Sequence, residues 1–212
     1  MSWTQTGFLV LGHKVLLTDL VGNVCALATL WLAYIRTIWT WPVQLLASVL
    51  LFVASVSAHI TGNALKQVMF GGLAMYGWWR WSRGLRDGRD LRVRPATGRE
   101  RLALIGVMVA GTGLVALFFE ATGWSWAPLP DAYIFVGSAV ATYAQGRALV
   151  DFWIMWVIVD MVGVPLAFSS GLVVSGVVYA VFFVMVLIGF RGWLRQYRAQ
   201  TTGTQNLEVV AS

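Results

Sequence analysis

Charged residues are scarce in this chain. Asp, Glu, Lys and Arg make up 11% of its 212 residues, whereas a typical soluble domain has roughly 25%. Hydrophobic residues make up 58%, and the mean hydropathy is +0.73. Because so little charge cannot cover the surface of a soluble protein of this length, the composition predicts that lipid surrounds much of the chain.

Cysteine and the common enzyme motifs are also missing. Cys25 is the single cysteine, which excludes an internal disulfide and gives no zinc or redox spacing. The sequence has no G-x-S-x-G, no H-E-x-x-H and no phosphate-binding loop. These absences argue against an enzyme, and they predict neither a metal nor a cofactor.

Seven apolar stretches of near membrane-spanning length are present, which predicts an all-α membrane protein with seven transmembrane helices. The predicted spans are Val15–Ile35, Pro42–His59, Ala64–Trp81, Leu102–Glu120, Ala132–Ala148, Phe152–Phe168 and Leu172–Phe190.

The arginines predict the orientation of these spans. The net charge is +6, and eight arginines lie within Arg80–Arg101. If this stretch is cytoplasmic, as the positive-inside rule requires, 13 of the 15 basic residues fall on the cytoplasmic side. The N-terminus is then outside and the C-terminus cytoplasmic, in a cell inner (plasma) membrane. The basic residues thus follow membrane topology, and we expect no nucleic-acid partner.

Related residues recur 112 positions apart in the two halves of the chain. A second three-helix unit in the same orientation needs one extra crossing, which the fourth span supplies. The sequence therefore predicts a 3+1+3 parallel repeat of SWEET-like type, an arrangement typical of transporters. The matched pairs are Asp19 and Asp131, Trp41 and Trp153, Phe70 and Phe182, Gly77 and Gly189, and Trp81 and Trp193.

The repeat predicts the division of the chain. The expected units are an N-terminal extracytoplasmic segment (1–14), a first three-helix repeat (15–82), a basic cytoplasmic linker with the connecting helix (83–131), a second repeat (132–195) and a cytoplasmic tail (196–212). The polar residues from Gln200 onward are typical of a disordered tail.

Polar side chains inside the spans predict the substrate site, because such groups are costly in hydrocarbon unless they face a cavity or a partner. Trp153, Trp156 and Asp160 are spaced i, i+3 and i+7, which places them on one helical face. Two indoles and a carboxylate suit a flat, polar-edged or cationic ligand. The alternative is that Trp153 is an interfacial residue and Asp160 bonds a neighbouring helix.

Corresponding positions in three other spans extend this stripe. These predicted substrate-binding residues are Trp41 and Gln44 in the second span, Asn63 and Gln67 in the third, and Tyr179 in the seventh. Interfacial hydration explains Asn63 equally well, and Tyr179 could instead bond another helix.

Tryptophans at the span ends are typical of the interfacial belts of membrane proteins. They are Trp39, Trp41, Trp78, Trp79, Trp81, Trp124, Trp126 and Trp193. We expect all of them except Trp41 to lie in such a belt.

Three segments resemble the PnuC family of vitamin-precursor transporters. The segments are Trp39-Thr-Trp41-Pro42, then Leu65, Gln67 and Tyr76-Gly77-Trp78 with Trp81, and then Trp153, Trp156 and Asp160 with Gly171, Tyr179, Gly189 and Trp193. The likeness covers residues 15–195. It implies a 3+1+3 fold, often trimeric, that moves a vitamin by facilitated diffusion, with trapping by intracellular phosphorylation.

The resemblance makes nicotinamide riboside the first expected substrate and assigns Trp153, Trp156, Asp160 and Gln67 to it. The chain departs from the family pattern at Phe152, where an Asn is common, and at Pro165–Phe168. Thiamine, riboflavin and deoxynucleosides therefore remain alternative substrates. A membrane assembly protein without transport activity is a further alternative.

Overall fold

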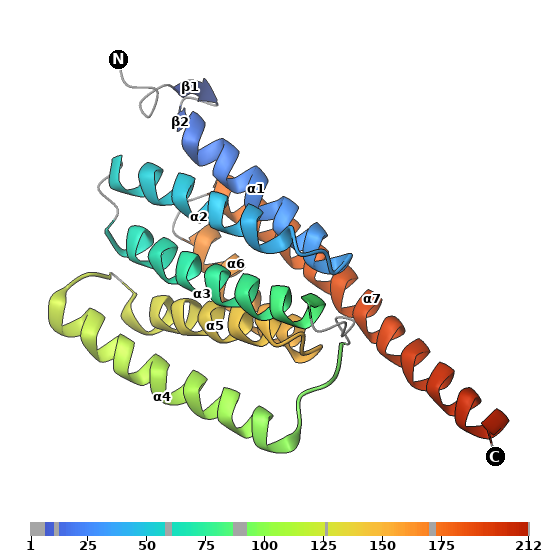
Figure 1. Cartoon of the computed structure of the whole chain (residues 1–212). Coiled ribbons are helices and arrows are strands. Elements are labelled where there is room, and N and C mark those ends of the chain that lie inside the picture. The colour runs from blue at the N-terminus through green and yellow to red at the C-terminus, as the bar shows by residue number, and fades with distance from the viewer. Residues whose placement is uncertain are drawn as a thin grey trace.

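The computed structural model describes residues 7–10, 13–57, 61–86, 93–125, 127–169 and 173–211 of the chain. This described part folds into seven helices and one short hairpin (Figure 1). The helices are α1 (Leu17–Tyr34), α2 (Thr40–Ser57), α3 (Thr61–Arg86), α4 (Gly98–Thr122), α5 (Pro128–Gly146), α6 (Asp151–Ser169) and α7 (Val173–Ala211).

A two-stranded antiparallel hairpin precedes α1. Strand β1 (Gly7–Val10) pairs with β2 (His13–Leu16), with Gly7 opposite Leu16. The hairpin lies mostly within the predicted N-terminal segment (1–14), and the first helix begins at Leu17, two residues later than the predicted span. The β-branched and aromatic residues of this segment favour strands. The length of an apolar run, which was the basis of the predicted spans, does not distinguish a strand from a helix.

Two helices extend beyond the predicted spans at the arginine-rich end. Helix α3 continues to Arg86, and α7 continues through the polar tail to Ala211. The expectation of a disordered tail from Gln200 was therefore wrong. A polar segment can stay helical when it continues a helix that is already formed, because only the first turn carries the nucleation cost.

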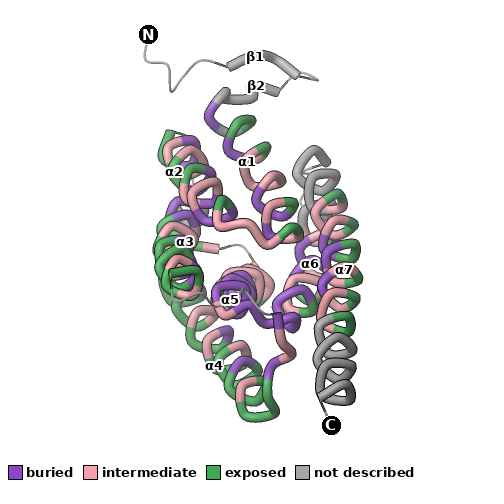
Figure 2. The backbone as a smooth tube through the Cα atoms, turned by 45° about the vertical axis from the view of Figure 1, so that its right-hand side comes forward, coloured by how far each residue is buried: buried purple, intermediate pink, exposed green. Residues whose placement is uncertain are grey.

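Six of the seven described helices form a closed ring. Around the ring, α1 contacts α2, α2 contacts α3, and α3 contacts α5. Helix α5 then contacts α6, α6 contacts α7, and α7 contacts α1. Figure 2 shows α2 and α3 on one side, α6 and α7 on the other, and α1 and α5 between them. Helix α4 lies outside this six-helix ring and packs against α5.

Helix α4 has the exposure expected of a helix in lipid. Leu102, Val109 and Leu114 are 69–73% exposed, and an apolar surface of this kind is unfavourable in water. Of the described helices, α2 and α4 are long and apolar enough to cross a membrane, which by itself is weak evidence for seven spans.

Two tryptophan rings pack directly on two glycines. A Cβ atom added at Gly77 would lie 2.3 Å from the Trp41 ring, and one added at Gly189 would lie 2.2 Å from the Trp153 ring. Both rings are fully buried. These close approaches join α2 to α3 and α6 to α7, and the two contacts are 112 positions apart.

The turns that follow α1 and α5 also match at this spacing. Arg36 and Ala148 both have positive φ, at 57° and 54°. The next turn is the same in both places, because Trp41 N donates to Ile38 O and Trp153 N donates to Val150 O, each at 3.2 Å. The backbone of the two segments therefore follows one pattern.

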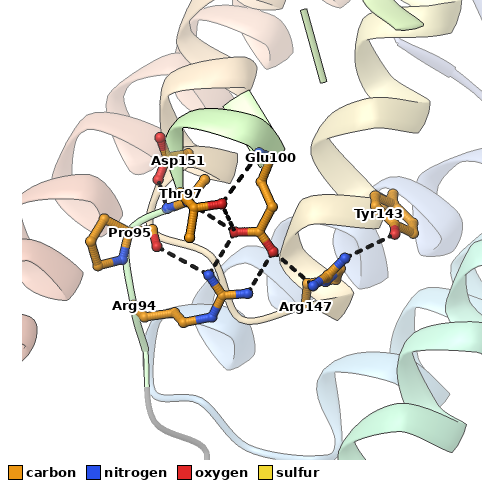
Figure 3. Close-up of polar contacts among 8 residues, drawn as sticks. Arg94, Pro95, Thr97, Glu100, Tyr143, Arg147 and Asp151 are labelled. Carbon is orange, nitrogen blue, oxygen red and sulfur yellow. Dashed lines mark hydrogen bonds and ion pairs between the residues drawn. The ribbon is translucent and has the colours of Figure 1, made fainter. Parts of the chain in front are cut away.

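An ion network at the start of α4 centres on Glu100 (Figure 3). The Nη1 and Nη2 atoms of Arg94 each donate to the Glu100 carboxylate at 2.7 Å, and Arg147 Nη2 donates to it at the same distance. Thr97 and Glu100 form a reciprocal capping box that begins the helix. The hydrogen bond to Glu100 raises the pKa of Arg94.

Asp151, the first residue of α6, completes the network. Its Oδ2 accepts from Ala96 N at 2.7 Å, and its Oδ1 accepts from Arg101 Nε at 2.6 Å. A parallel backbone bridge joins Arg94 to Leu149 beside it. The segment before α4 is therefore fastened to the turn between α5 and α6.

We predict that Gly77→Ala and Gly189→Ala each lower the stability of the protein. The added methyl group overlaps a buried indole ring, and overpacking of this kind costs about 1–3 kcal/mol. Thermal unfolding in detergent measures the effect. Gly72→Ala is the control, because nothing lies within 4 Å of a Cβ at that position of α3. Equal melting of Gly77→Ala and Gly72→Ala would contradict the packing described.

Candidate functional site

The predicted stripe on α6 is buried, and several of its polar atoms are unpaired. Trp153 and Asp160 are buried, and Trp156 is half-buried. The Nε1 atoms of both tryptophans and Oδ2 of Asp160 have no hydrogen-bond partner among the described residues. An unpaired polar atom away from water is costly, so these three groups are candidates to bind a polar ligand or water.

The matching stripe on α2 has the same character. Trp41 and Gln44 are buried, and the Trp41 Nε1 and Gln44 Oε1 atoms are likewise unpaired within the described part of the chain. Ser48 differs, because its hydroxyl donates to Gln44 O at 2.9 Å within the helix. Trp41 and Gln44 thus repeat the pattern of α6, while Ser48 is satisfied locally.

An aromatic stack crosses the six-helix ring. The rings of Phe70 on α3 and Trp156 on α6 are 6.4 Å apart and inclined by 20°. Helix α5 separates α3 from α6 in the order of neighbours, so this stack joins helices that are not adjacent around the ring. It therefore marks the interior. Phe70 was not predicted as a site residue, although its match to Phe182 and its position three residues after Gln67 were visible in the sequence.

Gln67 and Asp160 lie at a similar level on facing helices. Helix α6 follows α5 through a tight turn and runs opposite to α3 (Figure 1). Gln67 precedes Phe70 by one turn of α3, and Asp160 follows Trp156 by one turn of α6. Because the two helices are antiparallel, both steps lead in the same direction along the central axis of the ring. Both side chains are buried, at 6% and 3% exposure.

Trp41 and Trp153 differ from Trp156 in how their rings are held. Trp153 lies on Gly189 and contacts the rings of Phe152 and Trp193, with centroids at 4.3 and 6.0 Å. Trp41 is held between Gly77 and Trp81 in the matching way. Much of each ring surface is taken up by packing, so in this conformation Trp156 is better placed to stack on a ligand.

Two predicted residues cannot be placed. The side chains of Asn63 and Tyr179 lie outside the residues whose side chains the structure describes. The described polar stripes therefore consist of Trp41 and Gln44 on α2, Gln67 on α3, and Trp156 with its neighbours on α6.

The prediction of an interfacial belt was wrong for two tryptophans. Trp81 and Trp193 are 1% and 0% exposed, because each is packed between helices. Trp39, Trp78, Trp79 and Trp124 are exposed, as a belt requires. Trp126 lies outside the described residues.

The interior of the ring therefore presents an aromatic stack, indole donors, and amide and carboxylate acceptors. This set can hold a flat ring by its face and by its polar edge. Among the described residues, no group of three or more His, Cys, Asp or Glu side chains is placed to hold a metal ion.

Comparison with known proteins identifies the family. Residues 16–195 match the family model described as nicotinamide mononucleotide transporter. This protein belongs to the PnuC family. Membership makes it a membrane transporter rather than an enzyme, and its helical structure agrees with that assignment.

Two named relatives differ in how similar they are to the chain. It is 46% identical over 197 residues to the riboflavin/roseoflavin transporter RibM of Streptomyces davaonensis, covering 91% of this chain and 92% of RibM. It is 23% identical over 212 residues to the nicotinamide riboside transporter PnuC of Escherichia coli, covering 88% and 89% of the two chains.

A solved structure shares the fold. The crystal structure of the vitamin B3 transporter PnuC superposes with a TM-score of 0.68, at 18% identity, over 86% of this chain and 82% of that one. At this level of identity, the match establishes the helical fold of the family and carries no conclusion about substrate.

Proposed function

We propose that this protein transports riboflavin or a closely related flavin through the six-helix ring by facilitated diffusion. The observations that carry the proposal are the stack of Phe70 on Trp156 and the unpaired polar atoms of the stripes on α2 and α6. The 46% identity to a riboflavin/roseoflavin transporter, twice the identity to the nicotinamide riboside transporter, supports the choice of flavin.

The chemistry of a flavin matches the side chains of the ring. Its flat three-ring system offers a large face for Trp156 and Phe70. Its carbonyl edge can accept from indole N–H groups, and its ring N–H and chain hydroxyls can donate to Gln44 Oε1 and Asp160 Oδ2. The atoms left unpaired on α2 and α6 therefore include both donors and acceptors of the kinds that a flavin needs.

Nicotinamide riboside is the second candidate, and Asp160 is the observation that favours it. A buried carboxylate can offset the positive charge of the nicotinamide ring, whereas a neutral flavin needs only a hydrogen-bond acceptor there. Gln67 at the same level can bind hydroxyl groups of either ligand. The two vitamins therefore make different use of Asp160.

We further propose that α1–α3 and α5–α7 are parallel repeats connected by α4, in the 3+1+3 arrangement. The matched turns at Arg36 and Ala148 and the matched contacts at Gly77 and Gly189 support this proposal. Movement of one repeat against the other would open the ring to either side in turn. Uncoupled transport in a trimer, with intracellular phosphorylation trapping the vitamin, completes the proposal.

We predict that riboflavin binds the purified protein more tightly than nicotinamide riboside does, as measured by calorimetric titration in detergent. Trp156→Ala should weaken riboflavin binding about 5- to 150-fold, because loss of a stacking aromatic costs roughly 1–3 kcal/mol. Trp78→Ala is the control, since Trp78 is exposed on the outer side of α3.

Three outcomes would count against the proposal. Tighter binding of nicotinamide riboside, thiamine or a deoxynucleoside would overturn the choice of flavin. Equal losses in Trp156→Ala and Trp78→Ala would move the site away from the Phe70–Trp156 stack. Absence of binding by all four compounds would favour an assembly protein without transport activity.

A further inference from the structure

Two buried indole groups form hydrogen bonds across the two seams of the six-helix ring, which are the contact of α3 with α5 and the contact of α7 with α1. Trp81 Nε1 on α3 donates to the carbonyl of Gly146 at the end of α5, at 3.1 Å. Trp193 Nε1 on α7 donates to the carbonyls of Ala33 and Tyr34 at the end of α1, at 3.1 and 3.2 Å. Helices α3 and α5, and α7 and α1, are the neighbours that join the first three helices to the last three.

The two bonds are equivalents of one another. Trp81 and Trp193 are 112 positions apart, and so are the acceptor residues Tyr34 and Gly146. In each case the third helix of one unit donates to the last turn of the first helix in the other unit. A pair of equivalent contacts of this kind is expected if a two-fold axis relates the two halves of the chain.

The acceptors are suited to a bond that opens and closes. Carbonyls in the last turn of a helix lack some of their intrahelical partners, so they can bind either a side chain or water. Arg36 and Ala148, with positive φ, end the two helices just beyond these carbonyls. When the halves separate, water can replace each indole, so the bond can break without leaving a buried unpaired atom.

Both bonds lie on one side of the substrate site. Trp81 follows Phe70 by eleven residues, which is about 16 Å along α3. Arg147 follows Gly146 directly, and the arginine distribution predicts this end of the ring to be cytoplasmic. A solute held at Phe70 and Trp156 would therefore have to pass the level of these bonds to reach the cytoplasm.

We propose that Trp81 and Trp193 are paired gate residues, whose indole N–H groups hold the cytoplasmic end of the ring closed and must release their carbonyls for the solute to leave. The proposal rests on transport through the ring, as inferred above, but on no particular vitamin. Nothing in the sequence order predicts these bonds, because each joins segments far apart in the chain.

Packing alone would not require the indole N–H. Trp81 makes an edge-to-face contact with Trp41, with centroids 5.1 Å apart at 89°, and Trp193 makes one with Trp153 at 6.0 Å and 81°. Phenylalanine can keep such a contact but cannot donate to a carbonyl. Trp81→Phe and Trp193→Phe therefore separate the gate from the packing.

Electron–electron distance measurement between spin labels tests the gate. Labels at Arg83→Cys on α3 and Arg195→Cys on α7, in a Cys25→Ser background, report the opening of the ring at this end. Both arginines are exposed and 112 positions apart. The measurement uses the full chain in lipid nanodiscs without any vitamin, so failure of the flavin proposal does not affect it.

The double variant Trp81→Phe/Trp193→Phe should shift the labels toward a longer distance. Each single variant should raise the ratio of open to closed populations roughly fivefold, in line with the loss of one hydrogen bond. Trp78→Phe, on the exposed face of α3, should leave the distribution unchanged. The single variants carry the test if the double variant does not fold.

An unchanged distance distribution in both single variants would overturn the gate, even if their melting temperatures fall. That combination would assign the two bonds to packing alone. An equal shift in Trp78→Phe would also overturn it, because the effect would then not depend on the seams.

Discussion

The contact of two tryptophan rings with two glycines underlies the rest of this structure. Because Gly77 and Gly189 have no side chain, the rings of Trp41 and Trp153 lie flush against the neighbouring helix. One helical turn after each glycine, a second tryptophan follows. This is Trp81 or Trp193, and the close packing places it at the seam between the two halves of the chain. There its N–H group reaches a carbonyl of the opposite half, and the ring of six helices closes. The polar stripes are enclosed as a consequence.

The two halves share this framework but differ in the chemistry they present to the interior. Gln44 occupies the place of Trp156, and Ser48 occupies the place of Asp160. The halves also differ at the arginine-rich end, where Asp151 and Glu100 fasten the start of α4 to the second half. The residue matching Asp151 in the first half is Trp39, which cannot accept such bonds. Such a difference between the halves suits the proposed site, because the proposed solute is itself asymmetric.

The sequence was a good guide to periodic and repeated features and a poor guide to contacts between distant segments. The spacing of Trp153, Trp156 and Asp160 predicted one buried face, and the structure buries or half-buries all three. The burial of Trp81 and Trp193 was missed, because their acceptors at Gly146 and Ala33 are helix-end carbonyls that leave no mark in side-chain chemistry. The same reason explains why Phe70 was overlooked: an aromatic residue in an apolar span is common, and only the fold brings it to Trp156.

The most direct test of the account is counterflow of labelled riboflavin in proteoliposomes that contain the purified protein. With unlabelled riboflavin inside and no ion gradient, labelled riboflavin should accumulate transiently, because a carrier with one alternating site exchanges one molecule for another. Absence of accumulation for riboflavin, with exchange of nicotinamide riboside, would keep the ring as a pathway and change its solute. Absence of exchange for either vitamin would contradict the claim that the six-helix ring is a vitamin pathway.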